Sequence, residues 1–133
     1  MTLTVELVSP EAKGWSGEAD GVLCRILGSG DIQFLTDHAP FLGALDIHTI
    51  TMFLTDGTKE VIAVRGGFVS VQHNSVKILS DESATPEHIN RSEALQEKER
   101  IDAIIARDAE DQDALEAQRW QVARIATVDE AGS

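Results

Sequence analysis

Apolar and polar residues alternate with a period of two over roughly the first eighty positions of the chain. The alternation runs through short segments at 2–7, 22–26, 47–54, 60–64 and 69–78. Such alternation is typical of strands that bury one face and expose the other. Short strands at this spacing, with no helix-length insert between them, predict an amino-terminal antiparallel β-sandwich, or flattened barrel, over residues 1–84.

Turn-forming residues separate these segments. The Asp-Gly pair at 56–57 lies between two strand candidates, and this pair is a strong signal for a hairpin. Residues 73–75 predict a second hairpin, and residues 28–31 predict a further turn between strands. The two glycines at 66–67 follow a strand directly and predict a tight bend or bulge where two strands approach closely.

Beyond residue 88 the apolar residues recur every three to four positions, which is the period of an amphipathic helix. Capping-box sequences at 90–93 and 113–116 mark two helix starts. The pattern predicts a carboxy-terminal domain over residues 85–133. We expect it to form an antiparallel hairpin of two helices, at about 91–106 and 113–127.

The second predicted helix has two apolar faces. Leu115 and Val122 form one stripe, and Trp120 lies on the opposite side of the helix. If the stripe packs on the first helix, Trp120 packs either on the sandwich or against a partner, and we favour the sandwich. The polar segment at 81–88 predicts a linker between the two domains.

Composition narrows the class of protein. The chain has 133 residues, 42% of them hydrophobic, which suffices for one core. Its net charge of −12 argues against nucleic-acid binding, because that binding depends on Lys and Arg. Residues 81–133 carry six basic against fourteen acidic side chains and are the more acidic part. We expect the single cysteine, Cys24, to be a small buried hydrophobe.

Two further patterns bear on location. No apolar run approaches the ~20 residues needed to cross a bilayer, and the amino terminus has no signal-peptide pattern. We therefore expect a protein that does not insert into the membrane directly and reaches it only through a partner.

Candidate chemistry is sparse. The four histidines, at positions 38, 48, 73 and 88, do not have the close spacing of metal ligands. The sequence has no nucleophile elbow, and its Gly-Gly pair is too short to cradle phosphates. We therefore expect no catalytic residue, no metal and no cofactor, and we interpret the chain as a binding protein rather than an enzyme.

Five motifs, taken in order, resemble the epsilon subunit of the F-type ATP synthase. They are WSGEA at 15–19, GDI at 30–32, DHAPFL at 37–42, RGGF at 65–68 and VKIL at 76–79. The resemblance spans essentially the whole chain, including the order of a β-sandwich followed by a helical hairpin. It therefore agrees with the fold predicted from the hydrophobic pattern.

This resemblance implies a function and partners. An epsilon subunit is a non-catalytic part of the central rotor, which links the gamma subunit to the ring of c subunits and couples ion translocation to ATP synthesis. The resemblance also implies a peripheral location on the cytoplasmic face of a bacterial plasma membrane, or on the stromal face of the thylakoid in a plastid. The resemblance further implies that the carboxy-terminal hairpin can regulate ATP hydrolysis.

Site residues follow from the resemblance by position. It places the contact with gamma at His38, Ala39, Pro40, Phe41 and Leu42. It places the contact with the c ring at Ser29, Gly30 and Asp31. Asp31 would pair with a basic or polar group of a c-subunit loop. Phe41 and Leu42 either form an apolar docking surface or belong to the core, and the sequence leaves both readings open.

The chain departs from the family at its nucleotide site. Some bacterial members bind ATP through an IDxxRA motif, and the corresponding residues here are 89–94, INRSEA. The candidate ATP-binding residues are therefore Ile89, Asn90, Glu93 and Arg119. Because a carboxylate at Glu93 would repel phosphates, we expect weak or no ATP binding.

The hairpin of some members also rises to inhibit the catalytic α/β hexamer, often through basic residues. The acidic hairpin of this chain does not favour that contact. An alternative reading, from a different class, is a small-ligand or nucleotide-sensing β-sandwich module outside an ATP synthase. Copurification with gamma distinguishes the two readings.

Overall fold

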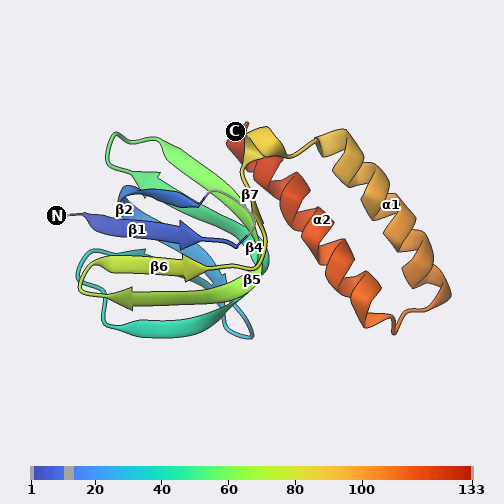
Figure 1. Ribbon diagram of the computed structural model, residues 1–133, viewed down its shortest axis with the longest axis horizontal. Coiled ribbons are helices and arrows are strands. Elements are labelled where there is room, and N and C mark those ends of the chain that lie inside the picture. Colours follow the sequence, from blue (N-terminus) through green and yellow to red (C-terminus); the bar gives the residue numbers. More distant parts are fainter. Residues whose placement is uncertain (1, 11–13, 133) are drawn as a thin grey trace.

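The structure, a computed structural model, describes residues 2–10 and 14–132 and consists of a β-sandwich followed by a helical hairpin (Figure 1). The strands within these residues are β1 (Leu3–Val8), β2 (Trp15–Ile26), β3 (Gly30–Leu35), β4 (Phe41–Leu54), β5 (Lys59–Gln72), β6 (Ser75–Leu79) and β7 (Ser83–Ala84). A 3₁₀ helix, η1 (Pro86–His88), leads into α1 (Arg91–Arg107) and α2 (Gln112–Ala131). The predicted fold class is confirmed.

The main strands pair in the order β1-β6-β5-β4-β2-β3, and β2 also pairs with β1. This second pairing closes the sheet into a flattened barrel. It is possible because the first part of β2 pairs with β1, while its later part pairs with β3 and β4. Among the described strands, one pair departs from the predicted antiparallel arrangement, since β1 and β6 run parallel. Alternation within a strand carries no information about the direction of its partner.

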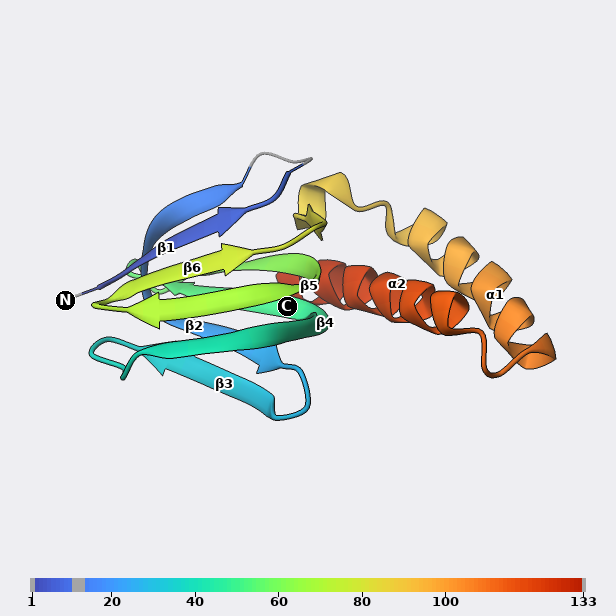
Figure 2. The same cartoon turned by 60° about the horizontal axis from the view of Figure 1, so that its bottom comes forward.

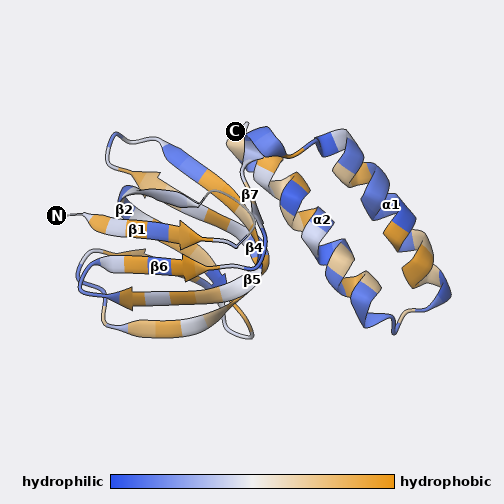
Figure 3. Ribbon diagram, in the orientation of Figure 1, coloured by the Kyte–Doolittle hydropathy of each residue, from blue (hydrophilic) through white to orange (hydrophobic). Residues whose placement is uncertain are grey.

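The core is built from the inward-facing positions of the alternating pattern. Apolar and polar residues alternate visibly along β1 in Figure 3, and Leu3, Val5 and Leu7 are all at most 3% exposed. Phe34 of β3 and Met52 of β4 are fully buried in the same cluster. Removing these side chains from water is the main force that holds the layers together.

Gly67 lies where β5 passes very close to β6. A Cβ atom at this position would come within 1.9 Å of the carbonyl oxygen of Leu79, and the backbone φ is 120°. No other residue fits both constraints without a shift of the backbone. The prediction of a close approach at the Gly-Gly pair is confirmed.

The two helices begin at capping residues. The Oδ1 atom of Asn90 accepts from the backbone N–H of Glu93 at 3.0 Å, as the first capping box predicts. The second N-cap was predicted two residues too late, at Asp113, because Asp111 is the N-cap and accepts from the backbone N–H of Ala114 at 3.0 Å. Helix α2 also continues to Ala131, beyond the predicted end near 127, and the predicted linker contains β7 and η1.

Helix α2 attaches the hairpin to the sandwich, and α1 packs on the outer side of α2 (Figure 2). Trp120 of α2 is 5% exposed and packs with Ala63, Ile89 and Ala123. This confirms that Trp120 packs on the sandwich. Val122, in contrast, is 47% exposed and does not continue the predicted stripe into the contact with α1.

Candidate functional site

The turn between β3 and β4 carries His38 and is held by local contacts. The backbone N–H of His38 donates to the carbonyl oxygen of Leu35 at 3.2 Å. The His38 ring lies edge-on to Phe34, with centroids 4.9 Å apart, and its Nδ1 is 2.7 Å from the carbonyl oxygen of Ala39. Because a carbonyl only accepts, Nδ1 carries a proton, which leaves Nε2 as the ring nitrogen for a further hydrogen bond.

A second turn, between β5 and β6, lies against the first. The backbone N–H of Asp37 donates to Oδ1 of Asn74 at 2.6 Å, and Nδ2 of Asn74 donates to the Asp37 carboxylate at 3.3 Å. The two turns border an open hollow of about 380 Å³ lined by Asp37, His38, Pro40, His73 and Asn74. The sequence predicted the turn at 73–75 but gave no signal that it meets the turn at His38, so His73 and Asn74 were missed as site residues.

Phe41 and Leu42 have different environments. Phe41 is partly buried, packs against the core and lies 5.3 Å from the Phe34 ring between centroids. Leu42 points outward and is 75% exposed. Because successive side chains of a strand point to opposite faces, Phe41 belongs to the core and Leu42 lies on the surface.

Leu42 borders a row of exposed apolar residues on the outer face of the sheet. Val8, Leu79 and Phe68 lie opposite one another on β1, β6 and β5, and they are 43%, 54% and 56% exposed. Ala44 lies opposite Phe68 and shares its face of β4 with Leu42. We call these five residues the apolar row. Contiguous exposed apolar side chains mark a site of interaction more often than scattered ones do.

The residues predicted to face the c ring lie at the other end of β3. Ser29, Gly30 and Asp31 form the turn that leads into this strand, on the side of the sandwich near the hairpin (Figure 2). Nε of Arg25 on the neighbouring strand donates to the Asp31 carboxylate at 2.9 Å. This hydrogen bond lowers the pKa of Asp31, so its carboxylate remains charged at neutral pH.

The candidate ATP-binding residues have different environments in the structure. Ile89 is buried beside Trp120, and Asn90 is occupied as the cap of α1. Glu93 is exposed in the first turn of α1. Arg119 points instead toward β4, where its Nη1 lies 3.4 Å from the carboxylate of Asp46. Ile89 and Arg119 therefore help to dock the hairpin on the sandwich, Asn90 caps α1, and Glu93 faces the solvent.

Arg65 on β5 joins the segment before β7 to helix α2. Its guanidinium pairs with Glu82 and with Glu116 of α2, each at 3.1 Å. It also lies 6.0 Å from the ring centroid of Trp120, within the range of a cation–π interaction. The RGGF motif therefore supplies both an anchor for the hairpin, at Arg65, and the close strand approach at Gly67.

The remaining candidate ligands are dispersed. Burial raises the pKa of the Cys24 thiol to about 12, so it stays neutral and behaves as a small hydrophobe, as predicted. Within residues 2–10 and 14–132, no three metal-ligating side chains converge on one point. In the same ranges, no helix combines the length and the apolar character needed to cross a membrane.

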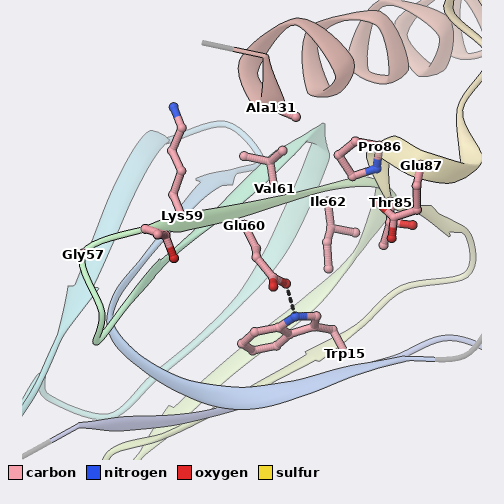
Figure 4. A pocket seen from close by; sticks show the side chains of 11 residues that line it. Trp15, Gly57, Lys59, Glu60, Val61, Ile62, Thr85, Pro86, Glu87 and Ala131 are labelled. Atoms are coloured by element: carbon pink, nitrogen blue, oxygen red, sulfur yellow. Dashed lines mark hydrogen bonds between the residues drawn. The ribbon is translucent and has the colours of Figure 1, made fainter.

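A large cavity borders both domains. It has a volume of about 660 Å³ and lies between the beginnings of β2 and β5, η1 and the end of α2 (Figure 4). Trp15 lies beneath Glu60 in this view, and its Nε1 donates to the Glu60 carboxylate. No residue of this cavity belongs to the contacts predicted from the sequence.

Residues 2–86 match the family model described as the β-sandwich domain of the ATP synthase delta/epsilon chain. The fold and this match place residues 2–86 in the class of ATP synthase delta/epsilon β-sandwich domains. An ATP synthase epsilon chain from Streptomyces avermitilis is 39% identical over 101 residues, which cover 76% of this chain and 81% of that relative. The chain belongs to the ATP synthase epsilon chain family.

Two solved structures share the fold. One is a chain of the Euglena gracilis mitochondrial ATP synthase, with a TM-score of 0.78, 15% identity and coverage of 99% of this chain and 82% of that one. The other comes from the central stalk and c ring of the Tetrahymena thermophila mitochondrial ATP synthase, with a TM-score of 0.54, 16% identity and coverage of 65% and 69%. At such identities the likeness concerns the fold alone.

Proposed function

We propose that this chain is a non-catalytic rotor subunit in the central stalk of an F-type ATP synthase, where it joins the gamma subunit to the c ring. By turning with both, it couples ion translocation to ATP synthesis. Membership of the epsilon chain family supports the proposal. So does the presence of a similar fold in the central stalk and c ring of another ATP synthase.

The apolar row is the observation that carries this proposal. A free sandwich gains nothing from exposing Leu42, Phe68 and Leu79, whereas a permanent partner removes them from water. Two members of the row, Leu42 and Ala44, lie on β4, the strand that begins next to His38. We propose that gamma covers the row, with the hollow beside His38 at the edge of the interface.

Copurification with gamma from the same source tests this contact. A Leu42→Ser, Phe68→Ser double variant is expected to lose most of the complex, because truncating central apolar anchors commonly costs about 2 kcal/mol or more each. Leu95→Ser on α1 is the matched control, since this leucine is also exposed, at 40%, but lies outside the row. Unchanged recovery of gamma with the double variant would refute the assignment.

We propose that Asp31, with Ser29 and Gly30, faces the polar loops of the c ring. The pair with Arg25 fixes the carboxylate at the tip of the turn and keeps it charged. A fixed charge at a rim steers and orients a partner more than it adds affinity. The chain would then be peripheral to the membrane, on the cytoplasmic face in a bacterium or the stromal face of the thylakoid in a plastid.

We propose that the hairpin stays docked and that ATP plays little part in holding it. Its anchors come from the protein itself, through Trp120, Arg65 and Arg119. Calorimetry is expected to detect weak or no ATP binding, and a submicromolar dissociation constant would contradict this. Deleting residues 86–133 tests for inhibition of the α/β hexamer, since a large rise in ATP hydrolysis would reveal a brake.

A further inference from the structure

The cavity of about 660 Å³ in Figure 4 has the features of a small-molecule site. Its volume lies within the range of about 300–1,000 Å³ that is usual for such sites. Trp15, Val61, Ile62 and Pro86 give it apolar walls, and Ala131 of α2 borders it. Its walls belong to the sandwich, η1 and the hairpin, so an occupant would touch both domains. We call this cavity the Trp15 pocket.

The indole of Trp15 is held in position before any ligand arrives. Its Nε1 donates to the Glu60 carboxylate on β5. A Cβ atom at position 17 would lie 2.8 Å from Cη2 of the indole, so Gly17 allows the ring to lie close against its own strand. These two contacts explain the Trp and the Gly of the WSGEA motif, neither of which takes part in the proposed contacts with gamma or the c ring.

The charges of the Trp15 pocket select the sign of its ligand. Glu60 contributes a carboxylate from β5 and Glu87 contributes one from η1. Hydrogen bonds from its own backbone N–H and from the Thr85 hydroxyl lower the pKa of Glu87, which remains ionised at neutral pH. The one ammonium of the lining, Lys59, pairs with Glu130 of α2 at 2.5 Å. The pocket is therefore net negative and repels phosphates and carboxylates.

We propose that the Trp15 pocket binds an organic cation with an apolar body. The cationic group lies near the carboxylates of Glu60 and Glu87, and the apolar part packs against the indole and Ile62. An aromatic face beside carboxylates is a suitable environment for an ammonium group. The site does not overlap the apolar row or Asp31, so it stands or falls independently of the proposed rotor function.

Titration with benzyltrimethylammonium, followed by the two indole N–H resonances in ¹H–¹⁵N spectra, tests the proposal on the full chain. The Trp15 resonance is expected to shift and saturate, while the resonance of Trp120, buried at the hairpin contact, stays in place. Phenylacetate has a similar ring with the opposite charge and is expected not to bind. A Trp15 shift that grows linearly without saturation, or equal binding of phenylacetate, would overturn the proposal.

Three variants locate the site. Glu60→Gln keeps an oxygen that accepts from Trp15 but removes the charge, and is expected to weaken binding about three- to tenfold. Glu99→Gln removes an exposed charge on α1 as a matched control and should leave affinity unchanged. Trp15→Leu should abolish binding in calorimetry, with the Trp120 resonance reporting that the variant is folded. Equal losses in Glu60→Gln and Glu99→Gln would mean that only net charge matters and would refute the site.

Discussion

Asp37, His73 and Asn74 are the described non-glycine residues with positive φ, at 65°, 51° and 61°. All three lie in the two turns that meet at one end of the sandwich. A left-handed backbone costs a side-chain-bearing residue about 1–2 kcal/mol, so such residues persist where their side chains compensate. Here the reciprocal bonds between Asp37 and Asn74 compensate, and they fix the turn that presents His38.

Two replacements of Asn74 separate the contribution of its side-chain hydrogen bonds from the cost of its left-handed backbone. Asn74→Ala removes both hydrogen bonds and keeps an unfavourable φ, so we expect a loss of about 1–2 kcal/mol in the free energy of unfolding. Asn74→Gly removes the same bonds but relieves the backbone, and should cost less. Urea denaturation measures both. Equal losses in the two variants would show that the left-handed backbone at this position carries no cost.

Gly67→Ala is expected to be among the most damaging substitutions in the sandwich. The added methyl group would meet the Leu79 carbonyl oxygen, which belongs to the backbone of β6 and has no side-chain freedom to move. We expect a loss of about 3 kcal/mol or more in the free energy of unfolding. Gly57→Ala is the matched control, because its φ is 87° but its Cβ would meet nothing within 4 Å. Thermal denaturation should show a much larger fall in the melting temperature for Gly67→Ala than for Gly57→Ala.

At the scale of elements, α2 holds the hairpin to the sandwich through one side of the helix. Trp120 and Ala123 bury apolar surface against Ala63 of β5 and against Ile89. The hydroxyls of Thr49 and Thr127 lie 2.8 Å apart across the same contact. Ion pairs such as that of Arg65 with Glu116 surround this apolar centre. Because exposed ion pairs contribute little, the buried indole dominates the docking energy.

Trp120→Ala is therefore expected to release the hairpin without unfolding the sandwich. Truncating a buried tryptophan costs about 3–5 kcal/mol, and here the loss falls on the contact cluster around Trp120, which is separate from the core cluster of the sandwich. Amide hydrogen exchange should accelerate along α2 while β4 and β5 remain protected. Val122→Ala, at an exposed position of the same helix, should leave exchange unchanged. Loss of protection in the strands as well would show that sandwich and hairpin unfold together.

The sequence predicted the alternating segments of the longer strands, the hairpin turns and both helices, because period, turn chemistry and capping are local properties. It did not predict β7, which lies in the segment that was interpreted as a linker. The predicted start of α2 was too late because Asp113 and Glu116 match the capping-box pattern, whereas the residue that caps the helix is Asp111. The meeting of Asp37 with Asn74 was out of reach, since it joins residues 37 positions apart. The apolar row was missed for the same reason: its members belong to four strands and become neighbours only through the closed sheet.

At the scale of the whole molecule, the two turns that take part in the proposed contacts, at Asp31 and at His38, lie at opposite ends of β3. A strand of six residues spans about 20 Å, so the turn at Asp31 and the turn at His38 lie too far apart to influence each other directly. The closed sheet between them provides a stiff connection. This geometry suits a subunit that is attached to two parts of a rotor at once.

The separation leads to a prediction about additivity. Asp31→Asn is expected to weaken retention of the c ring by less than about fivefold, since a rim charge contributes little, and to leave gamma binding unchanged. Leu42→Ser should weaken gamma binding and leave retention of the c ring unchanged. Because mutations more than about 7–10 Å apart usually add, the double variant should show the sum of the two effects on each partner. Assembly of epsilon, gamma and the c ring, measured by copurification and by affinity for each partner alone, provides the comparison. A gamma affinity that falls with Asp31→Asn would mean that the two surfaces are energetically coupled through the sandwich, and the picture of a passive rigid connector would have to be abandoned.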